Sequence, residues 1–298
     1  MQADRQTLLT CRNRRVGETT RAVRDRRLCF VVPVSGEYAR MARALGNSVR
    51  YFHPHSRLVA VTTGTPPVEI SVLAESGPFD EVVAFEDAGI GDEGYSAVIW
   101  TKLQVMSSPL GEILVILDAD MLMYRRVDAL VEQFERSGKL LAATLDDDPI
   151  LASAFKTRDL AVMSRYDVPA LCACLIIVRP SSSVSALALA KAREINGRTR
   201  WPEQAALSAF AAEYGGWCEL DHGAVIQSRD REVLNAPRGT VFIHVGSPRP
   251  ETFGASPLRW DEMTLSELAR DFRERWGQPF PVAKLCSDFE MRLNNDWA

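Results

Sequence analysis

Apolar residues occur along the chain in two alternating patterns, short continuous runs and runs at helical spacing. The continuous runs are rich in Val, Ile and Leu, which is typical of strands buried on both faces of a parallel sheet. We expect strands at 28–34, 57–63, 81–85, 113–117, 140–144, 170–178, 217–220 and 240–245. Their alternation with helical segments predicts one α/β domain with a mostly parallel central sheet flanked by helices.

Apolar residues at intervals of three and four predict the helices between these strands. The helical segments are 38–51, 95–106, 127–134, 184–195 and one that begins near Pro202. Three consecutive aspartates, 146–148, are interpreted as a solvated loop. The weakly patterned segment 149–170 is expected to form a loop or lid.

The two ends of the chain differ from this middle region, which we place at residues 28–254. Residues 1–27 contain eight arginines against three acidic residues, with few apolar positions, so we expect a flexible basic tail. Such a tail is either simply solvated or docks on an anionic membrane surface or a nucleic acid. A capping-box sequence at Thr264, followed by an apolar helical stripe, predicts that residues 255–298 form a helical extension packed on the domain.

The composition narrows the class of protein. Of 298 residues, 46% are hydrophobic and 25% are charged, as in ordinary globular proteins. No apolar run approaches the ~20 residues of a membrane span, and no secretory leader is recognisable, so we expect a cytoplasmic protein. The net charge of −4 argues against a nucleic-acid-binding body. The six cysteines lack the CxxC spacing of a zinc site, and we read them as small apolar residues.

The candidate chemistry stands at the end of the most apolar run. Asp118 and Asp120 follow it directly, separated by one residue. Strand geometry points both side chains the same way, and ligands of α/β sheets bind beyond the carboxyl ends of strands. Two neighbouring carboxylates call for a cation between them, and hard oxygen ligands suit Mn²⁺ or Mg²⁺. The alternative is that these aspartates form a turn or cap a helix.

Several motifs around this Asp-x-Asp pair resemble glycosyltransferase family 8, which includes the glycogenin and galactosyltransferase types. The matching stretches are Val34-Ser35-Gly36-Glu37-Tyr38, Thr101-Lys102-Leu103, Leu117-Asp118-Ala119-Asp120-Met121, Pro202-Glu203-Gln204 and the segment from His244 to Pro250. The resemblance spans about Leu28 to Pro250. It implies the GT-A fold, a Rossmann-like fold of nucleotide-sugar transferases.

The family resemblance also implies roles for individual residues. The metal ligands would be Asp118, Asp120 and His244, and the ion Mn²⁺ or Mg²⁺. The nucleotide site would comprise Val34, Tyr38, Lys102, Asp118, Ala119, Asp120, Gly246 and Arg249. Glu203 and Gln204 would face the sugar, and Arg249 would clamp the β-phosphate as charge develops there.

The chain departs from the family pattern at four places. Cys172-Ala173-Cys174 replaces an Asn-x-Gly sequence that lines the donor-sugar pocket, and Glu203 replaces an aspartate. Arg249 stands for a lysine, and the spacing from His244 to the following Gly and basic residue is one residue shorter.

The resemblance implies a metal-dependent glycosyltransferase that moves a sugar from a nucleotide-diphosphate donor, a UDP-sugar, to an acceptor hydroxyl with retention. The acceptor stays open among a glycan, a lipid-linked sugar, a protein, a small molecule and a modified nucleobase. The alternative hypotheses are an inactive transferase-like scaffold that binds a nucleotide or glycan, and an Asp-x-Asp phosphohydrolase. Residue by residue, His244 is alternatively an ordinary strand-end histidine, Lys102 a solvated helix residue and Tyr38 a core residue.

Overall fold

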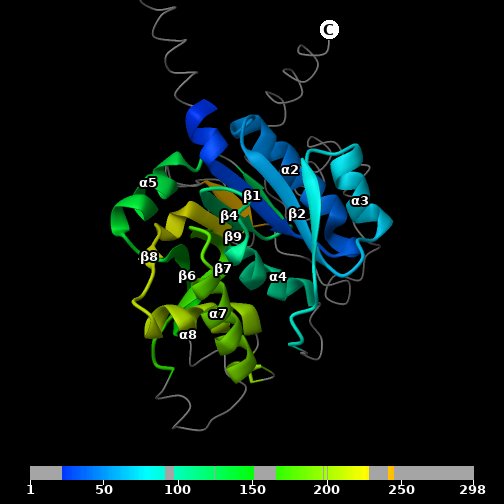
Figure 1. The fold of residues 1–298 in the computed structure, drawn as a ribbon. Coiled ribbons are helices and arrows are strands. Elements are labelled where there is room, and N and C mark those ends of the chain that lie inside the picture. The colour runs from blue at the N-terminus through cyan, green and yellow to red at the C-terminus, as the bar shows by residue number, and fades with distance from the viewer. Residues whose placement is uncertain are drawn as a thin grey trace, which may run out of the picture.

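The computed structural model describes residues 22–90, 97–123, 125–150, 166–196, 198–199, 201–227 and 241–244. Its main sheet consists of β1 (Leu28–Pro33), β2 (Arg57–Thr63), β3 (Glu81–Phe85), β4 (Ile113–Leu117), β6 (Leu141–Ile150), β7 (Pro169–Val178) and β8 (Cys218–Glu219). The strand order is β3-β2-β1-β4-β7-β6-β8 (Figure 1). The predicted α/β class with a mostly parallel sheet is confirmed.

One strand of the main sheet runs against the others. β1 pairs in parallel with β2 and β4, whereas β7 pairs antiparallel with β4 and β6. Leu117, the last residue of β4, lies opposite Leu175 of β7. The first half of β7 therefore extends past the carboxyl end of β4, which is the edge where Asp118 and Asp120 emerge.

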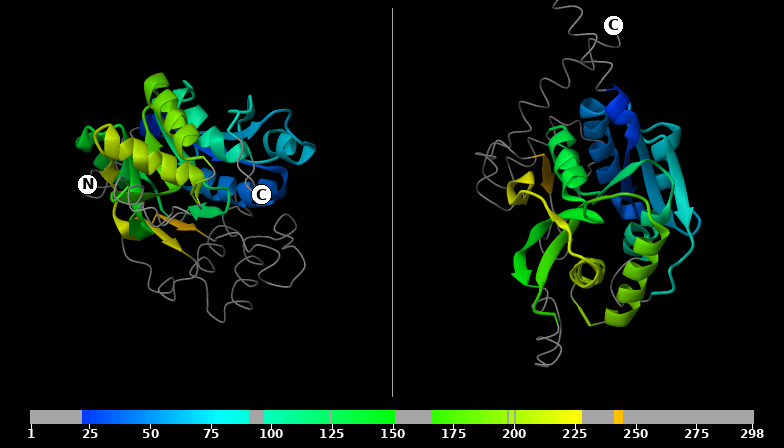
Figure 2. Two further views of the ribbon diagram at one scale, coloured as in Figure 1. Left: turned by 90° about the horizontal axis from the view of Figure 1, so that it is seen from below. Right: turned by 60° about the vertical axis from the view of Figure 1, so that its left-hand side comes forward.

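Helices cover both faces of the sheet (Figures 1 and 2). On one face lie α2 (Ala39–Phe52), α3 (Val68–Glu75) and α5 (Asp128–Ser137); on the other lie α4 (Thr101–Gln104), α7 (Ser182–Ile195) and α8 (Pro202–Glu213). Short 3-10 turns occur at Gly36–Tyr38, Ala97–Trp100, Val105–Ser107 and His222–Ala224. Alternate residues of β1 belong to the two cores, Phe30 to one and Val31 to the other, because successive strand side chains point to opposite faces.

A second, three-stranded sheet adjoins the carboxyl edge of the first. It consists of β5 (Met121–Met123), β9 (Val225–Gln227) and β10 (Phe242–His244), in the order β5-β10-β9. β10 pairs antiparallel with β5 and places His244 opposite Met121. This pairing brings a residue from far along the chain next to the Asp118–Asp120 turn.

Some elements differ from the sequence-based expectations, and one predicted segment is not described. α3, β5 and β9 were not predicted. The aspartates 146–148 belong to β6 instead of a solvated loop. The helix expected over 95–106 is described from Ala97 and is broken into 3-10 and α-helical turns. The predicted C-terminal extension, 255–298, lies outside the described residues.

The predicted basic tail also needs a correction at its end. Residues 22–27, the end of the predicted tail, are helical, and residues 1–21 lie outside the described part. Asp25 is buried, and its Oδ1 accepts hydrogen bonds from Arg126 and from His53 Nδ1, the latter at 2.9 Å. His53 Nε2 accepts the amide hydrogen of Val127 at 3.1 Å. This polar network holds the helical turn against the amino ends of the strands.

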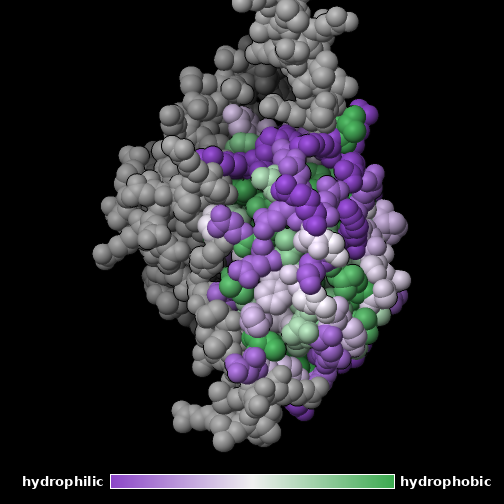
Figure 3. Space-filling model, turned by 90° about the vertical axis from the view of Figure 1, so that its left-hand side faces the viewer, coloured by the Kyte–Doolittle hydropathy of each residue, from purple (hydrophilic) through white to green (hydrophobic). Residues whose placement is uncertain are grey.

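None of the helices within the described residues is long and apolar enough to cross a bilayer. On the face turned to the viewer in Figure 3, hydrophobic side chains form only small patches among polar ones.

The Asp25 network predicts a large stability effect. Replacing Asp25 with alanine leaves the Arg126 guanidinium and the buried His53 Nδ1 without their shared acceptor. We expect the free energy of unfolding to fall by about 3 kcal/mol in urea titrations. The control is Glu132→Gln, which breaks only the exposed ion pair with Arg24 and should cost under about 1 kcal/mol. Equal losses in the two variants would contradict this account.

The same network predicts a pH dependence. Burial alone would raise the pKa of Asp25, but the hydrogen bonds from His53 and Arg126 and the charge of Arg126 lower it below its ordinary value. Because the pKa is lower in the folded state, the contribution of Asp25 to stability is complete above the unfolded pKa of about 3.9. It is lost as the pH falls through the folded pKa. The stability gap between the wild type and Asp25→Ala should therefore be smaller at pH 3 than at pH 6.

Candidate functional site

Asp118 and Asp120 begin the candidate site at the carboxyl end of β4. The strand residues before them are completely buried. The amide of Asp118 donates to the carbonyl oxygen of Cys174 in β7 at 3.0 Å, and the Met121 amide donates to the Asp118 carbonyl at 3.3 Å. The turn between β4 and β5 is thus tied to the main sheet and to its own backbone, which holds both carboxylates at the edge.

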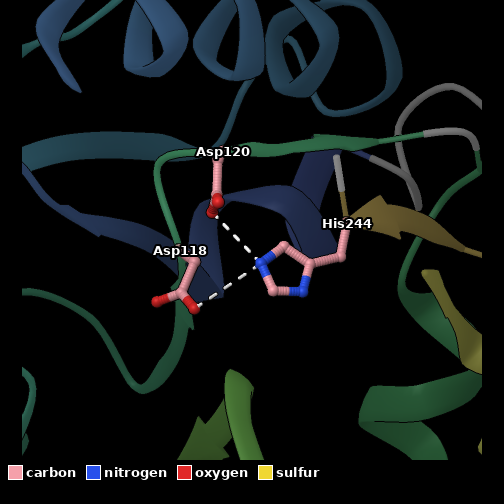
Figure 4. Close-up of side chains that lie close together, drawn as sticks. All are labelled: Asp118, Asp120 and His244. Carbon is pink, nitrogen blue, oxygen red and sulfur yellow. Dashed lines mark hydrogen bonds and ion pairs between the residues drawn. The ribbon is translucent and has the colours of Figure 1, made fainter. Parts of the chain in front are cut away.

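His244 completes a group of three possible metal ligands. Its Nε2 lies 3.2 Å from Asp120 Oδ1 and 4.0 Å from Asp118 Oδ2, and Figure 4 shows the imidazole facing both carboxylates. One ligand atom from each residue lies within 4.8 Å of the others, and all three side chains are partly buried. The β5–β10 pairing provides this approach, since His244 lies directly opposite Met121.

This donor set fits a divalent cation. Two ligands held about 2.1 Å from one ion lie at most about 4.2 Å apart, and both distances from His244 Nε2 satisfy that limit. Two carboxylate oxygens and an imidazole nitrogen suit Mn²⁺, which accepts mixed oxygen and nitrogen ligands. The other ring nitrogen of His244 is buried and has no hydrogen-bond partner among the described residues.

Lys102 supplies a buried positive charge beside the carboxylates. Its side chain is only 6% exposed, and its Nζ pairs closely with Asp118 Oδ1, lies 3.5 Å from Glu203 Oε1 and donates to the Ala173 carbonyl at 3.3 Å. Burial alone would lower the pKa of Lys102, but the charges of Asp118 and Glu203 raise it above its ordinary value. Lys102 is therefore a permanent cation that occupies one oxygen of Asp118 and leaves Oδ2 facing His244.

Glu203 and Gln204 enter the site from the first turn of α8. Glu203 is 14% exposed, and its Oε2 is buried without a hydrogen-bond partner in the part of the chain that the structure describes. Gln204 Oε1 accepts the Ala173 amide hydrogen at 3.4 Å, while its Nε2 donates to Asp146 in β6. The helix start thus holds one carboxylate with an unsatisfied oxygen and one amide fixed between two strands.

Cys172, Ala173 and Cys174 form the wall of the site in β7. The Sγ atoms of Cys172 and Cys174 are 3.0 Å apart; the first side chain is partly exposed and the second is buried. The hydrogen bond from Cys174 lowers the pKa of Cys172 against the effect of burial, and the charge of His244 lowers it further. The same hydrogen bond, together with burial, raises the pKa of Cys174.

Among its described residues, the candidate site carries more negative than positive side chains. Burial alone would lower the pKa of His244, but its hydrogen bond to Asp120 and the charges of Asp120 and Asp118 raise it to about 9. His244 is therefore protonated at neutral pH in the metal-free protein. Even so, within the part of the chain that the structure describes, the carboxylates of Asp118, Asp120 and Glu203 outnumber the cations Lys102 and His244.

The structure brings together most of the predicted site residues that it describes. Asp118, Asp120, Lys102, Glu203 and His244 form one connected group. The side chains of Val34 and Ala119 are buried, and Tyr38 packs against the core on the α2 side. Gly246 and Arg249 lie outside the described residues.

Sequence reasoning missed the role of the β7 backbone. The Ala173 carbonyl and amide hold Lys102 and Gln204, and the Cys174 carbonyl holds Asp118. Any residue type can make these backbone hydrogen bonds, so the sequence does not reveal them. The Cys172-Ala173-Cys174 segment could be found only because it departs from the family pattern. Asp146, which the sequence places in a solvated loop, instead accepts a hydrogen bond from Gln204 Nε2.

Comparisons with known proteins give structural matches only. No protein-family model matches the chain, and the search of curated proteins found no match. The galactosyltransferase LgtC, solved with donor and acceptor sugar analogs, is 14% identical with a TM-score of 0.55, and the match covers 84% of this chain and 95% of LgtC. An active-site mutant of LgtC matches with 14% identity, a TM-score of 0.51 and the same coverage.

A further match is the bifunctional glycosyltransferase WbbM. It is 15% identical with a TM-score of 0.52, and the match covers 89% of this chain but 52% of WbbM. At these identities the likeness concerns the fold, which is the GT-A fold expected from the sequence motifs.

Lys102 gives the first prediction for this site. Lys102→Met leaves Asp118 and Glu203 without their shared cation, so we expect the free energy of unfolding to fall by about 3 kcal/mol or more. Adding Glu203→Gln to this variant removes one of the two unpaired carboxylates. The free energy of unfolding of the double variant should exceed that of Lys102→Met by more than about 1 kcal/mol. Lys191→Met is the matched control, because Lys191 also joins two carboxylates, Glu194 and Glu213, but these are more exposed than Asp118 and Glu203. A double variant no more stable than Lys102→Met would contradict the proposed coupling.

His244 gives a second prediction, for metal binding measured by calorimetry. Below pH 9 a cation that takes the Nε2 lone pair must release the proton that His244 holds. The apparent Mn²⁺ affinity should therefore rise about tenfold per pH unit between pH 6 and pH 8. His244→Gln should bind Mn²⁺ more weakly and lose this slope. An affinity independent of pH in the wild type would remove His244 from the ligand set.

Proposed function

We propose that this protein is a metal-dependent glycosyltransferase of the family 8 type, which transfers a sugar from a UDP-sugar to an acceptor hydroxyl. The observation that carries the proposal is the convergence of Asp118, Asp120 and His244 at the carboxyl edge of a GT-A sheet, next to the buried Lys102–Glu203 pair. In α/β sheets this edge is where ligands bind. Of the motifs resembling family 8, those that contain Lys102, Asp118, Asp120 and Glu203 contribute to this group, as does His244.

The charge balance supports metal-dependent binding of the donor. Because carboxylates outnumber cations among the described residues of the site, we expect the metal-free protein to bind a diphosphate poorly. A divalent ion held by Asp118, Asp120 and His244 would reverse this and act as a Lewis acid that stabilises the departing nucleoside diphosphate. Lys102 keeps Asp118 oriented by occupying its other oxygen, so the ligand set does not have to be assembled on binding.

The sugar half of the donor site is assigned to Glu203 and Gln204. Glu203 Oε2 is buried without a partner among the described residues, and a sugar hydroxyl can donate to it. Gln204 is held by Asp146 and Ala173, which fixes the first turn of α8 and thereby the position of Glu203. We assign these two residues to sugar positioning and not to metal binding.

The remaining expected contacts belong to the nucleotide half. Arg249 is assigned to the β-phosphate, and Gly246 to close backbone approach beside it. Val34, Tyr38 and Ala119 are assigned to the nucleoside, with Tyr38 offering an aromatic face to the base.

Retention of the anomeric configuration is proposed from the resemblance to family 8, and the acceptor classes stay as named above. Docking of the basic tail on a membrane surface or nucleic acid also stays a prediction.

The second candidate is a transferase-like scaffold that binds nucleotide without turnover. The observation in its favour is Cys172-Ala173-Cys174 at the position of the Asn-x-Gly sequence. Donor hydrolysis in the absence of acceptor separates the two, because a scaffold releases no UDP from any UDP-sugar.

Thermal unfolding with UDP and Mn²⁺ tests the proposal. UDP at ~100 times its dissociation constant should stabilise the protein by ~2.7 kcal/mol, which raises the unfolding temperature by about 5 °C. Mn²⁺ must be present for this shift, since we expect the metal-free site to bind the diphosphate poorly. Replacing UDP with GDP tests whether the site prefers a donor whose nucleoside is uridine.

Two variants sharpen the test. Asp120→Asn removes a ligand and should abolish the shift, whereas Glu132→Gln, whose exposed side chain pairs with Arg24, should leave it unchanged. An equal UDP shift with and without Mn²⁺, or no shift with either nucleotide, would overturn the metal-dependent transferase.

A further inference from the structure

The strand that walls the candidate site carries two thiols within reach of each other. Cys172 and Cys174 alternate along β7, so their side chains share one face, and their Sγ atoms are 3.0 Å apart. A disulfide bond is about 2.05 Å long, so about 1 Å separates the thiol pair from a covalent link. Cys29 and Cys218, the other cysteines in the described ranges, lie in different strands, β1 and β8.

The local backbone can accommodate such a link. Alternate residues of an extended strand are about 6.6 Å apart at Cα, close to the upper limit of about 6.8 Å for a disulfide, so the link requires the strand to contract. The β6–β7 ladder is already interrupted here, because Ala142 pairs with Ile177 while Thr144 pairs with Cys172. On the other side, the β4–β7 ladder begins only at Leu175. Ala173 itself is therefore not a paired ladder position on either side, although its neighbour Cys172 is paired with Thr144.

The contracted segment would be the one that holds the candidate site. The Ala173 carbonyl accepts from Lys102, the Ala173 amide donates to Gln204, and the Cys174 carbonyl accepts from Asp118. Rotation of the peptide groups around Ala173 alters all three hydrogen bonds together. The disulfide would thus loosen residues on α4, α8 and the β4–β5 turn without touching any of their side chains.

We propose that Cys172 and Cys174 are a redox-active dithiol, oxidised by a peroxide to an intrastrand disulfide that loosens this hydrogen bonding and weakens donor binding. The effect on the donor rests on the proposed function; formation of the disulfide does not.

The chemistry begins at the partly exposed thiol. The Cys172 thiolate attacks one oxygen of hydrogen peroxide, the O–O bond breaks, and the departing hydroxide takes up a proton to leave as water. The resulting sulfenic acid is attacked by the Cys174 sulfur, so that the S–S bond forms, the S–O bond breaks and a second water carries away the Cys174 proton. Cys174 can remain buried throughout, because its only partner in the second step is Cys172. A dithiol reductant reverses the reaction by exchange.

The test uses the full chain with Cys11→Ser and Cys286→Ser, so that thiols outside the described residues do not contribute. After hydrogen peroxide, we expect the peptide containing Cys172 and Cys174 to lose two hydrogen atoms in mass and to resist alkylation. Dithiothreitol should reverse both changes. Amide hydrogen exchange in peptides containing Asp118 and Ala173 should be faster in the oxidised protein, and the thermal shift caused by UDP with Mn²⁺ should fall by at least half.

Control variants assign the effect to this pair. Cys172→Ser should abolish the link and every response to peroxide, whereas Cys218→Ser should retain them all. If no link forms, or if it forms with unchanged exchange at Asp118 and Ala173, the proposal is overturned. If the reduced protein shows no shift with UDP and Mn²⁺, the proposed function fails instead, and the mass and exchange measurements still decide whether the dithiol acts as proposed.

Discussion

The crowding of negative charge at one edge of the sheet is the constraint on which the site depends. Asp118, Asp120 and Glu203 come from two separate elements, yet all three lie around the same two cations, Lys102 and His244. Carboxylates placed this closely repel one another unless a cation compensates them. Lys102 does so permanently from a buried position, whereas His244 does so only while it is protonated. The site is therefore arranged so that exchanging one proton for a divalent cation changes its charge, and with it the affinity for a diphosphate.

The fold provides this arrangement through two features of strand pairing. The antiparallel β7 passes the end of β4 and offers backbone groups to Asp118, Lys102 and Gln204. The small β5-β10-β9 sheet brings His244 against the Asp-x-Asp turn. Both features depend on contacts between residues far apart in the sequence. The network around Asp25 lies at the opposite, amino ends of the strands. Buried polar groups therefore hold the sheet at both strand ends.

The main sheet and the candidate ligands could be predicted from the sequence because their signals are local. The run Ile113–Leu117 ends in two aspartates, and β2 and β3 were predicted with their observed bounds. β5 was missed because three residues between a turn and a loop show no period, and it exists only by pairing with β10. α3 was missed because only Ile70 and Leu73 of its eight residues are buried. The buried contacts of Lys102 could not be predicted either, because its partners Asp118, Ala173 and Glu203 come from three different elements.

The central claim is that a divalent ion and a uridine nucleotide meet at Asp118, Asp120 and His244. Anomalous diffraction at the manganese edge, from crystals grown with Mn²⁺ and UDP, tests it most directly. The account predicts one anomalous peak within about 2.0–2.3 Å of a carboxylate oxygen from each aspartate and of His244 Nε2, with the UDP diphosphate on its open side. A manganese peak away from these three residues, or UDP bound with no metal beside it, would contradict it.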